Sequence, residues 1–104
     1  KKVQVEKIGG FCIDLSHLMS ARRKSTKEYD YVSQRRNKKL FVCNHISGYC
    51  PMKITDLHEV DNLQSFDYLT DLPEYLFGKY IAIEVMNPIE YQVQIKKYIS
   101  KILS

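Results

Sequence analysis

The chain has 104 residues, of which 44% are hydrophobic and 27% are charged, and its formal net charge is +4. This length allows one small domain, and the composition excludes an intrinsically disordered chain. No run of about 18 apolar residues occurs, so the sequence predicts no transmembrane helix. The excess positive charge is compatible with a polyanionic partner or with an ordinary solvated basic surface.

Three short apolar segments read as strands that are covered on both faces, as parallel strands are. They are expected at residues 11–15, 40–45 and 80–85. Between them lie helical patterns, and the order strand, helix, strand, helix, strand, helix predicts an α/β fold with a parallel sheet. We therefore expect three consecutive βα units of a TIM-barrel-like fold.

The helical segments have recognisable starts. Ser25 and Glu28 have capping-box spacing before a helix at about 26–36. A broken helical segment is expected at 65–77, interrupted at Pro73. Asn87 and Pro88 are typical of a helix cap and a first helical position. In that last helix an apolar stripe recurs at helical spacing, made of Tyr91, Ile95, Tyr98, Ile99 and Ile102.

Each predicted strand ends in a side chain that binds metals, namely Asp14, His45 and Glu84. Alternation along the strands places these three side chains on one face, together with the small residues Cys12, Cys43 and Ala82. The carboxyl ends of parallel strands meet at one edge, and neighbouring strands lie about 4.8 Å apart. The three side chains are therefore expected to converge on a divalent ion.

Three further residues extend this set. His17 follows Asp14 by one turn, on what is expected to be a loop. Asp56 and His58 lie in the long segment 46–63, which is expected to be an active-site loop, and an extended backbone points both the same way. All three histidines of the chain belong to the set. Taken singly, Asp14 is explained equally well as a cap of the following segment, whereas Glu84 favours metal binding or catalysis over a structural ion pair. His45 alone is more typical of a core or loop histidine, and Asp56 and His58 alone are more typical of a solvated loop.

The cysteines allow two interpretations. The chain has three cysteines, an odd number that gives no obvious disulfide framework. Cys12 and Cys43 lie in apolar runs. Together these observations predict buried reduced thiols in a cytoplasmic protein. A metal site built from Cys43, His45 and Cys50 is the alternative, but it lacks a fourth ligand at the usual spacing.

Four short motifs occur in order over nearly the whole chain: Phe-Cys-Ile-Asp-Leu-Ser-His at 11–17, Asn-His-Ile-Ser at 44–47, Asp-Leu-His at 56–58 and Ile-Glu-Val-Met-Asn-Pro at 83–88. They resemble the C-terminal part of the endonuclease IV and xylose-isomerase-like TIM barrels, the AP endonuclease family 2 superfamily. The resemblance implies that residues 1–104 form a single domain, the C-terminal portion of a (β/α)8 barrel.

The resemblance also implies roles for the six residues. Asp14, His45 and Glu84 match the central metal site of the superfamily. His17, Asp56 and His58 match the ligands of an additional zinc in the endonuclease branch, which cleaves DNA phosphodiesters at abasic sites. Zinc is then the expected cofactor, DNA the expected partner, and Glu84 and His17 the expected catalytic residues. The basic segments 22–24 and 35–39 are candidates for contact with the DNA backbone.

Two alternatives stay open. In the isomerase and epimerase branch a single manganese or magnesium ion binds a sugar or sugar phosphate, and His17 contacts the sugar. The endonuclease branch usually has a glycine-rich turn after Asp-x-His, whereas residues 59–64 contain no glycine. Because three strands cannot close a barrel, we expect a second chain or the missing half-barrel to complete the fold, and the chain alone to be inactive. The remaining possibility is a non-catalytic association fragment.

Overall fold

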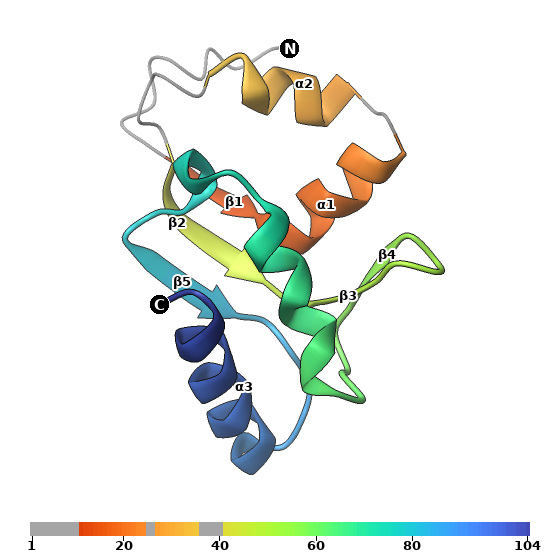
Figure 1. Cartoon of the computed structure of the whole chain (residues 1–104), viewed down its shortest axis with the longest axis vertical. Coiled ribbons are helices and arrows are strands. Elements are labelled where there is room, and N and C mark those ends of the chain that lie inside the picture. The colour runs from red at the N-terminus through yellow and green to blue at the C-terminus, as the bar shows by residue number, and fades with distance from the viewer. Residues whose placement is uncertain (1–10, 25–26, 36–40) are drawn as a thin grey trace.

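A parallel three-stranded sheet organises the part of the chain that the computed structural model describes, residues 11–24, 27–35 and 41–104. Its strands, in the spatial order β1-β2-β5, are β1 (Phe11–Asp14), β2 (Phe41–Ile46) and β5 (Tyr80–Ile83). Figure 1 shows the three strands side by side. The predicted mixed α/β fold with a parallel sheet is therefore confirmed.

Helices and a hairpin connect the strands. The α-helices are α1 (Leu15–Arg23), α2 (Lys27–Ser33) and α3 (Ile89–Ile102), and the 3-10 helices are η2 (Leu63–Asp71) and η3 (Glu74–Leu76). The hairpin consists of β3 (Gly48–Cys50) and β4 (Thr55–Leu57), which pair antiparallel. The segment 46–63, expected to be a loop, thus contains this hairpin. The break between η2 and η3 falls at Pro73, as predicted.

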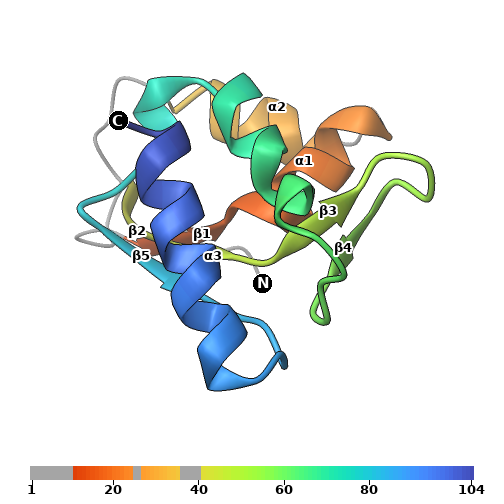
Figure 2. The same ribbon diagram turned by 60° about the horizontal axis from the view of Figure 1, so that its bottom comes forward.

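The helices lie on one side of the sheet (Figure 2). On that side Ile13, Asn44 and Ile46 are buried. On the other side Cys12 and Ala82 are exposed. The predicted division of the strands into a bulky covered face and a small second face is therefore correct for these residues, and in the described part of the chain the small face is open to solvent. We call it the open face.

Val42 departs from the predicted alternation. It was expected on the covered face, yet 46% of it is exposed, while Phe41 is buried. The register explains this, because Phe11 pairs with Phe41 but Cys12 pairs with Cys43, so that Val42 is an extra residue in β2. A bulge of this kind reverses the faces to which the side chains on one side of it point. Phe41 therefore points to the covered face and Val42 to the other face.

The core fills the space between the covered face and the helices. Its most deeply buried large apolar side chains are Leu15, Ile46, Phe66, Leu69, Leu76 and Ile95. Burying each contributes about 1.5–3 kcal/mol relative to exposure. In α3 the predicted stripe is confirmed at four positions, because Ile95 and Ile99 are buried and Tyr91 and Tyr98 pack against the core.

One buried polar side chain fixes β5 beside β2. Asn44 is 0% exposed, donates through Nδ2 to Leu76 O at 2.7 Å, and accepts through Oδ1 from Gly78 N at 2.7 Å. Gly78 is required at this point, since a Cβ there would lie 2.3 Å from the carbonyl carbon of Val42. Together these residues set where β5 begins and hence where Glu84 lies.

Two local predictions about helix starts were wrong. His17, expected on a loop after a strand that ends at Leu15, lies in α1, which begins at Leu15 and has Asp14 as its N-cap. Asn87 does not cap α3, whose N-cap is Pro88. The Asn87 side chain instead accepts from Val60 N and donates to Val60 O, both at 2.9 Å, because the chain before η2 passes close to it. Ser25, Leu40 and residues 36–39 lie outside the described residues.

The prediction of buried reduced thiols was wrong for two cysteines. Cys12 and Cys43, which are register partners with a Cα–Cα separation of 4.6 Å, form a disulfide between β1 and β2. Cys12 is exposed and Cys43 half-buried, because both point to the open face. Cys50, on β3, is free.

Among the helices of the described residues, none combines the length and the apolar character that crossing a membrane would require.

Candidate functional site at the strand ends

Asp14 ends β1 and caps α1 with the same carboxylate. Its Oδ1 accepts hydrogen bonds from His17 N at 2.9 Å and Ser16 Oγ at 2.8 Å. The side chain stands opposite His45 of β2 in register. The capping interpretation is therefore confirmed, and the same two hydrogen bonds hold the carboxylate beside the next strand end.

His45 and Glu84 meet at the end of the open face. His45 Nδ1 contacts Glu84 Oε1, and their side chains are 45% and 44% exposed. Glu84 N donates to Ile46 O at 2.7 Å, which carries the β2–β5 pairing past the end of β5. A pair this exposed adds little to stability. The contact instead orients the His45 ring. With the Glu84 carboxylate at Nδ1, the imidazole is held in place and Nε2 is the ring nitrogen on its other side.

Asp56 and His58 form a second pair beside the first. His58 Nε2 lies 3.2 Å from Asp56 Oδ2, as the Asp-x-His spacing predicts. His58 Nδ1 lies 3.3 Å from Glu84 O, and Met86 N donates to His58 O at 2.6 Å. The chain after β4 is thereby held against the chain after β5. Five of the six predicted residues thus lie in two adjacent pairs and at one strand end next to them.

His17 occupies the first turn of α1 and is exposed. Its position next to the Asp14 cap keeps it at the same end of the sheet as the two pairs. The β4 strand, which carries Asp56, packs beside α1. The structure therefore places all six predicted residues around the carboxyl ends of the strands.

Beneath these side chains lies a buried hydroxyl network that the sequence did not reveal. Ser16 Oγ and Ser47 Oγ are 2.7 Å apart, and Tyr68 donates to Ser47 O at 2.8 Å. Burial raises the pKa of Tyr68 far above its ordinary value, and the nearby carboxylates of Asp14 and Asp56 act in the same direction. The signal in the sequence is that Ser16 and Ser47 lie within two residues of the ends of β1 and β2.

The arrangement has the donor chemistry of a divalent-metal site but not a complete ligand set. Carboxylates and imidazoles are suitable ligands for zinc, manganese or magnesium. Within residues 11–24, 27–35 and 41–104, however, no three such side chains form a group that would hold an ion. Both nitrogens of His58 already face a partner, Asp56 or Glu84 O. The best-placed donors are Asp14 and Nε2 of His45.

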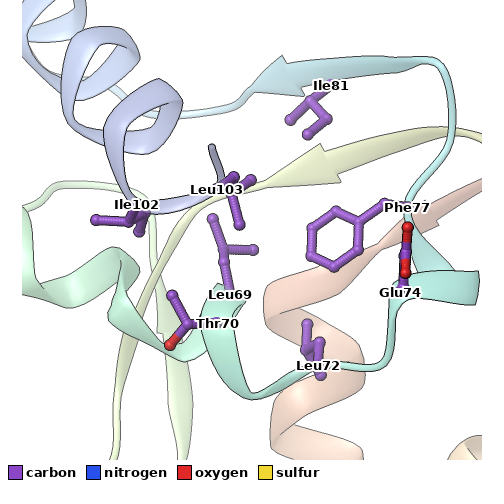
Figure 3. A pocket seen from close by; sticks show the side chains of 8 residues that line it. All are labelled: Leu69, Thr70, Leu72, Glu74, Phe77, Ile81, Ile102 and Leu103. Carbon is purple, nitrogen blue, oxygen red and sulfur yellow. The ribbon is translucent and has the colours of Figure 1, made fainter.

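Two other features lie away from this site. A pocket of about 460 Å³ is lined by Leu69, Thr70, Leu72, Glu74, Phe77, Ile81, Ile102 and Leu103. Figure 3 shows it between the end of α3 and β5, and it contains none of the predicted residues. The exposed cations Arg22, Arg23 and Lys24 end α1, a helix of 9 residues, which places them about 13 Å from the Asp14 end.

Comparison of the chain with protein-family models, curated proteins and solved structures finds no match. The assignment to a family consequently depends on the four motifs and on the chemistry of the strand ends.

Proposed function

We propose that the chain supplies three consecutive βα units of an endonuclease IV-like TIM barrel and takes part in zinc-dependent hydrolysis of DNA phosphodiesters at abasic sites. The observation that carries the proposal is the placement of Asp14, His45 and Glu84. They end three neighbouring parallel strands on the open face, with His45 and Glu84 in contact.

In this proposal the residues at the strand ends have different roles. Asp14 and His45 Nε2 would hold the central ion, and Glu84 orients the imidazole through Nδ1. His17, Asp56 and His58 would hold the additional zinc. A bound zinc would polarise the phosphoryl oxygen and lower the pKa of a water. The hydroxyl network of Ser16, Ser47 and Tyr68 keeps the Asp14 carboxylate in place.

The open face supports the proposed barrel. Cys12 and Ala82, which would face the barrel interior, are exposed in the described structure. The remaining strands, from the missing half-barrel or a second chain, would cover this face and supply the further ligands that the described residues lack. The cytoplasmic location was expected from reduced thiols, and the Cys12–Cys43 disulfide removes that support, since disulfides are rare in that compartment.

DNA binding tests the proposal, because cleavage requires the remaining strands whereas binding at the strand ends does not. Fluorescence anisotropy with the disulfide intact would compare a duplex that contains an abasic site with the undamaged duplex, in the presence and absence of zinc. We expect zinc-dependent preference for the abasic duplex, and loss of that preference in His45→Ala. Glu59→Gln, at an exposed position next to His58 in the sequence but outside the six residues, is the control.

Equal binding of the two duplexes, or binding that does not depend on zinc, would contradict the proposal. Binding of a single exchangeable manganese or magnesium ion that a ketose strengthens would favour the sugar isomerase alternative.

A further inference from the structure

The open face carries four side chains of metal-binding types, arranged as two neighbouring pairs across β1 and β2. Cys12 and Cys43 are register partners, and Asp14 and His45 are the next partners on the same face. Cys43 and His45 are two residues apart on β2, about 6.6 Å along the strand, and so are Cys12 and Asp14 on β1. The neighbouring strand β1 thus adds two ligands, Cys12 and Asp14, to the pair Cys43 and His45, and the site does not need Cys50.

We propose that reduction of the Cys12–Cys43 disulfide creates a thiolate metal site, with Cys12, Cys43 and His45 as ligands of one zinc-like ion and Asp14 as the fourth. This site goes beyond the proposed hydrolytic function, although the two share Asp14 and His45, because its defining ligands are sulfurs that the hydrolytic site does not use.

The geometry of the two cysteines fits a common ion. Their Cα atoms are 4.6 Å apart and both sulfurs point to the open face, where Cys12 is exposed. Two sulfurs bound to one tetrahedral zinc, each at about 2.3 Å, lie roughly 3.8 Å apart. Two register partners on neighbouring strands lie close enough for this separation. The contact of Glu84 with Nδ1 of His45 leaves Nε2 as the nitrogen for the ion.

The chemistry balances with a dithiol or phosphine as the reductant. The disulfide accepts two electrons and two protons, the S–S bond breaks, and two S–H bonds form while the reductant is oxidised. Binding of the ion then displaces the two thiol protons and forms two metal–sulfur bonds. In the oxidised protein the two sulfurs are bonded to each other and do not bind the ion.

Cobalt(II) provides a direct test, because thiolate ligands give it a charge-transfer absorption that oxygen and nitrogen ligands do not. The reduced protein, freed of reductant without oxygen, should bind one cobalt with this absorption and with the strong visible bands of tetrahedral coordination. The oxidised protein should show no charge-transfer absorption. Cobalt bound to a purely Asp, His and Glu site would lack it too, which separates failure of this inference from failure of the proposed function.

Matched variants assign the ligands. Cys12→Ser and Cys43→Ser should each weaken cobalt binding at least tenfold, whereas Cys50→Ser, which removes the cysteine on β3, should leave the spectrum unchanged. His45→Ala should weaken binding, and Glu59→Gln, an exposed substitution outside the six predicted residues, should not. Charge-transfer absorption that persists in Cys12→Ser at full strength, or that is lost in Cys50→Ser, would overturn the inference.

A measurement on the unaltered chain covers the case in which a cysteine variant fails to fold. Zinc should protect Cys12 and Cys43 of the reduced protein against alkylation, followed by mass spectrometry, and should leave the alkylation rate of Cys50 unchanged. Equal alkylation of Cys12 and Cys43 with and without zinc would contradict the site.

Discussion

Replacing Asn44 tests how β5, and with it Glu84, is held beside β2. The side chain is fully buried and bonds two backbone groups at and just after the end of η3, Leu76 O and Gly78 N, each at 2.7 Å. In Asn44→Ala both groups would lose their partner. The η3–β5 connection would then be free to move away from the central strand.

The expected cost follows from these two bonds. Leaving one buried donor or acceptor unsatisfied costs about 1–3 kcal/mol, so Asn44→Ala should lower the free energy of unfolding by roughly 3 kcal/mol. This is a large part of the 5–15 kcal/mol that is usual for a domain. Asn44→Asp should cost at least as much at neutral pH, because it buries a carboxylate that faces the Leu76 carbonyl oxygen.

Urea denaturation monitored by circular dichroism would measure the change. Asn62→Ala is the matched control, since Asn62 is exposed and its side chain makes no capping hydrogen bond to η2. That variant should change the free energy of unfolding by less than about 0.5 kcal/mol. If Asn44→Ala cost less than about 1 kcal/mol, Asn44 would not be what positions β5, and the reasoning would be refuted.

Three further substitutions test other parts of the structure. Gly78→Ala should destabilise the protein by about 3 kcal/mol in urea denaturation, because its Cβ would overlap the Val42 backbone, and a cost below about 1 kcal/mol would contradict the close approach. Ile54 has a φ of 51°, so Ile54→Asn, which tolerates the left-handed backbone, should raise stability by about 1 kcal/mol, and an unchanged or lower Tm would speak against strain in the β3–β4 turn. Burial raises the pKa of Tyr68 above its ordinary 10.0, so that the neutral phenol of the folded state stabilises the protein below pH 10 and this contribution declines as the pH rises further. Tyr68→Phe should therefore be less stable than the wild type at pH 7 but lose less stability between pH 9 and pH 11, and parallel pH profiles of Tm would exclude this role.

The sequence was sufficient to predict the sheet because apolar strands leave a strong signal. The segments 11–15, 40–45 and 80–85 correspond to β1, β2 and β5, and the alternation of Cys12 with Ile13 gives the correct faces. The Asp-x-His pairing was also predictable, because an extended backbone brings side chains at i and i+2 to one face.

Other features depend on contacts between distant residues, which no local pattern contains. The displacement of Val42 arises from a bulge against β1, and Asn87 bonds Val60 rather than capping α3 because the two segments meet in the fold. The Cys12–Cys43 disulfide needed the register of two strands that are 31 residues apart in the sequence. The α1 helix was missed because its polar residues, such as Ser16 and Ser20, weaken the helical pattern although both are buried.

We expect the carboxyl ends of the three strands to bind a divalent metal, and zinc titration by calorimetry with the disulfide intact would measure this binding. Glu84→Gln and Glu59→Gln are the same substitution on two exposed glutamates, of which Glu84 contacts His45. The wild type and Glu59→Gln should bind zinc equally, and Glu84→Gln should bind it at least about tenfold more weakly. Equal affinities in all three proteins, or no zinc binding by the wild type, would contradict this expectation.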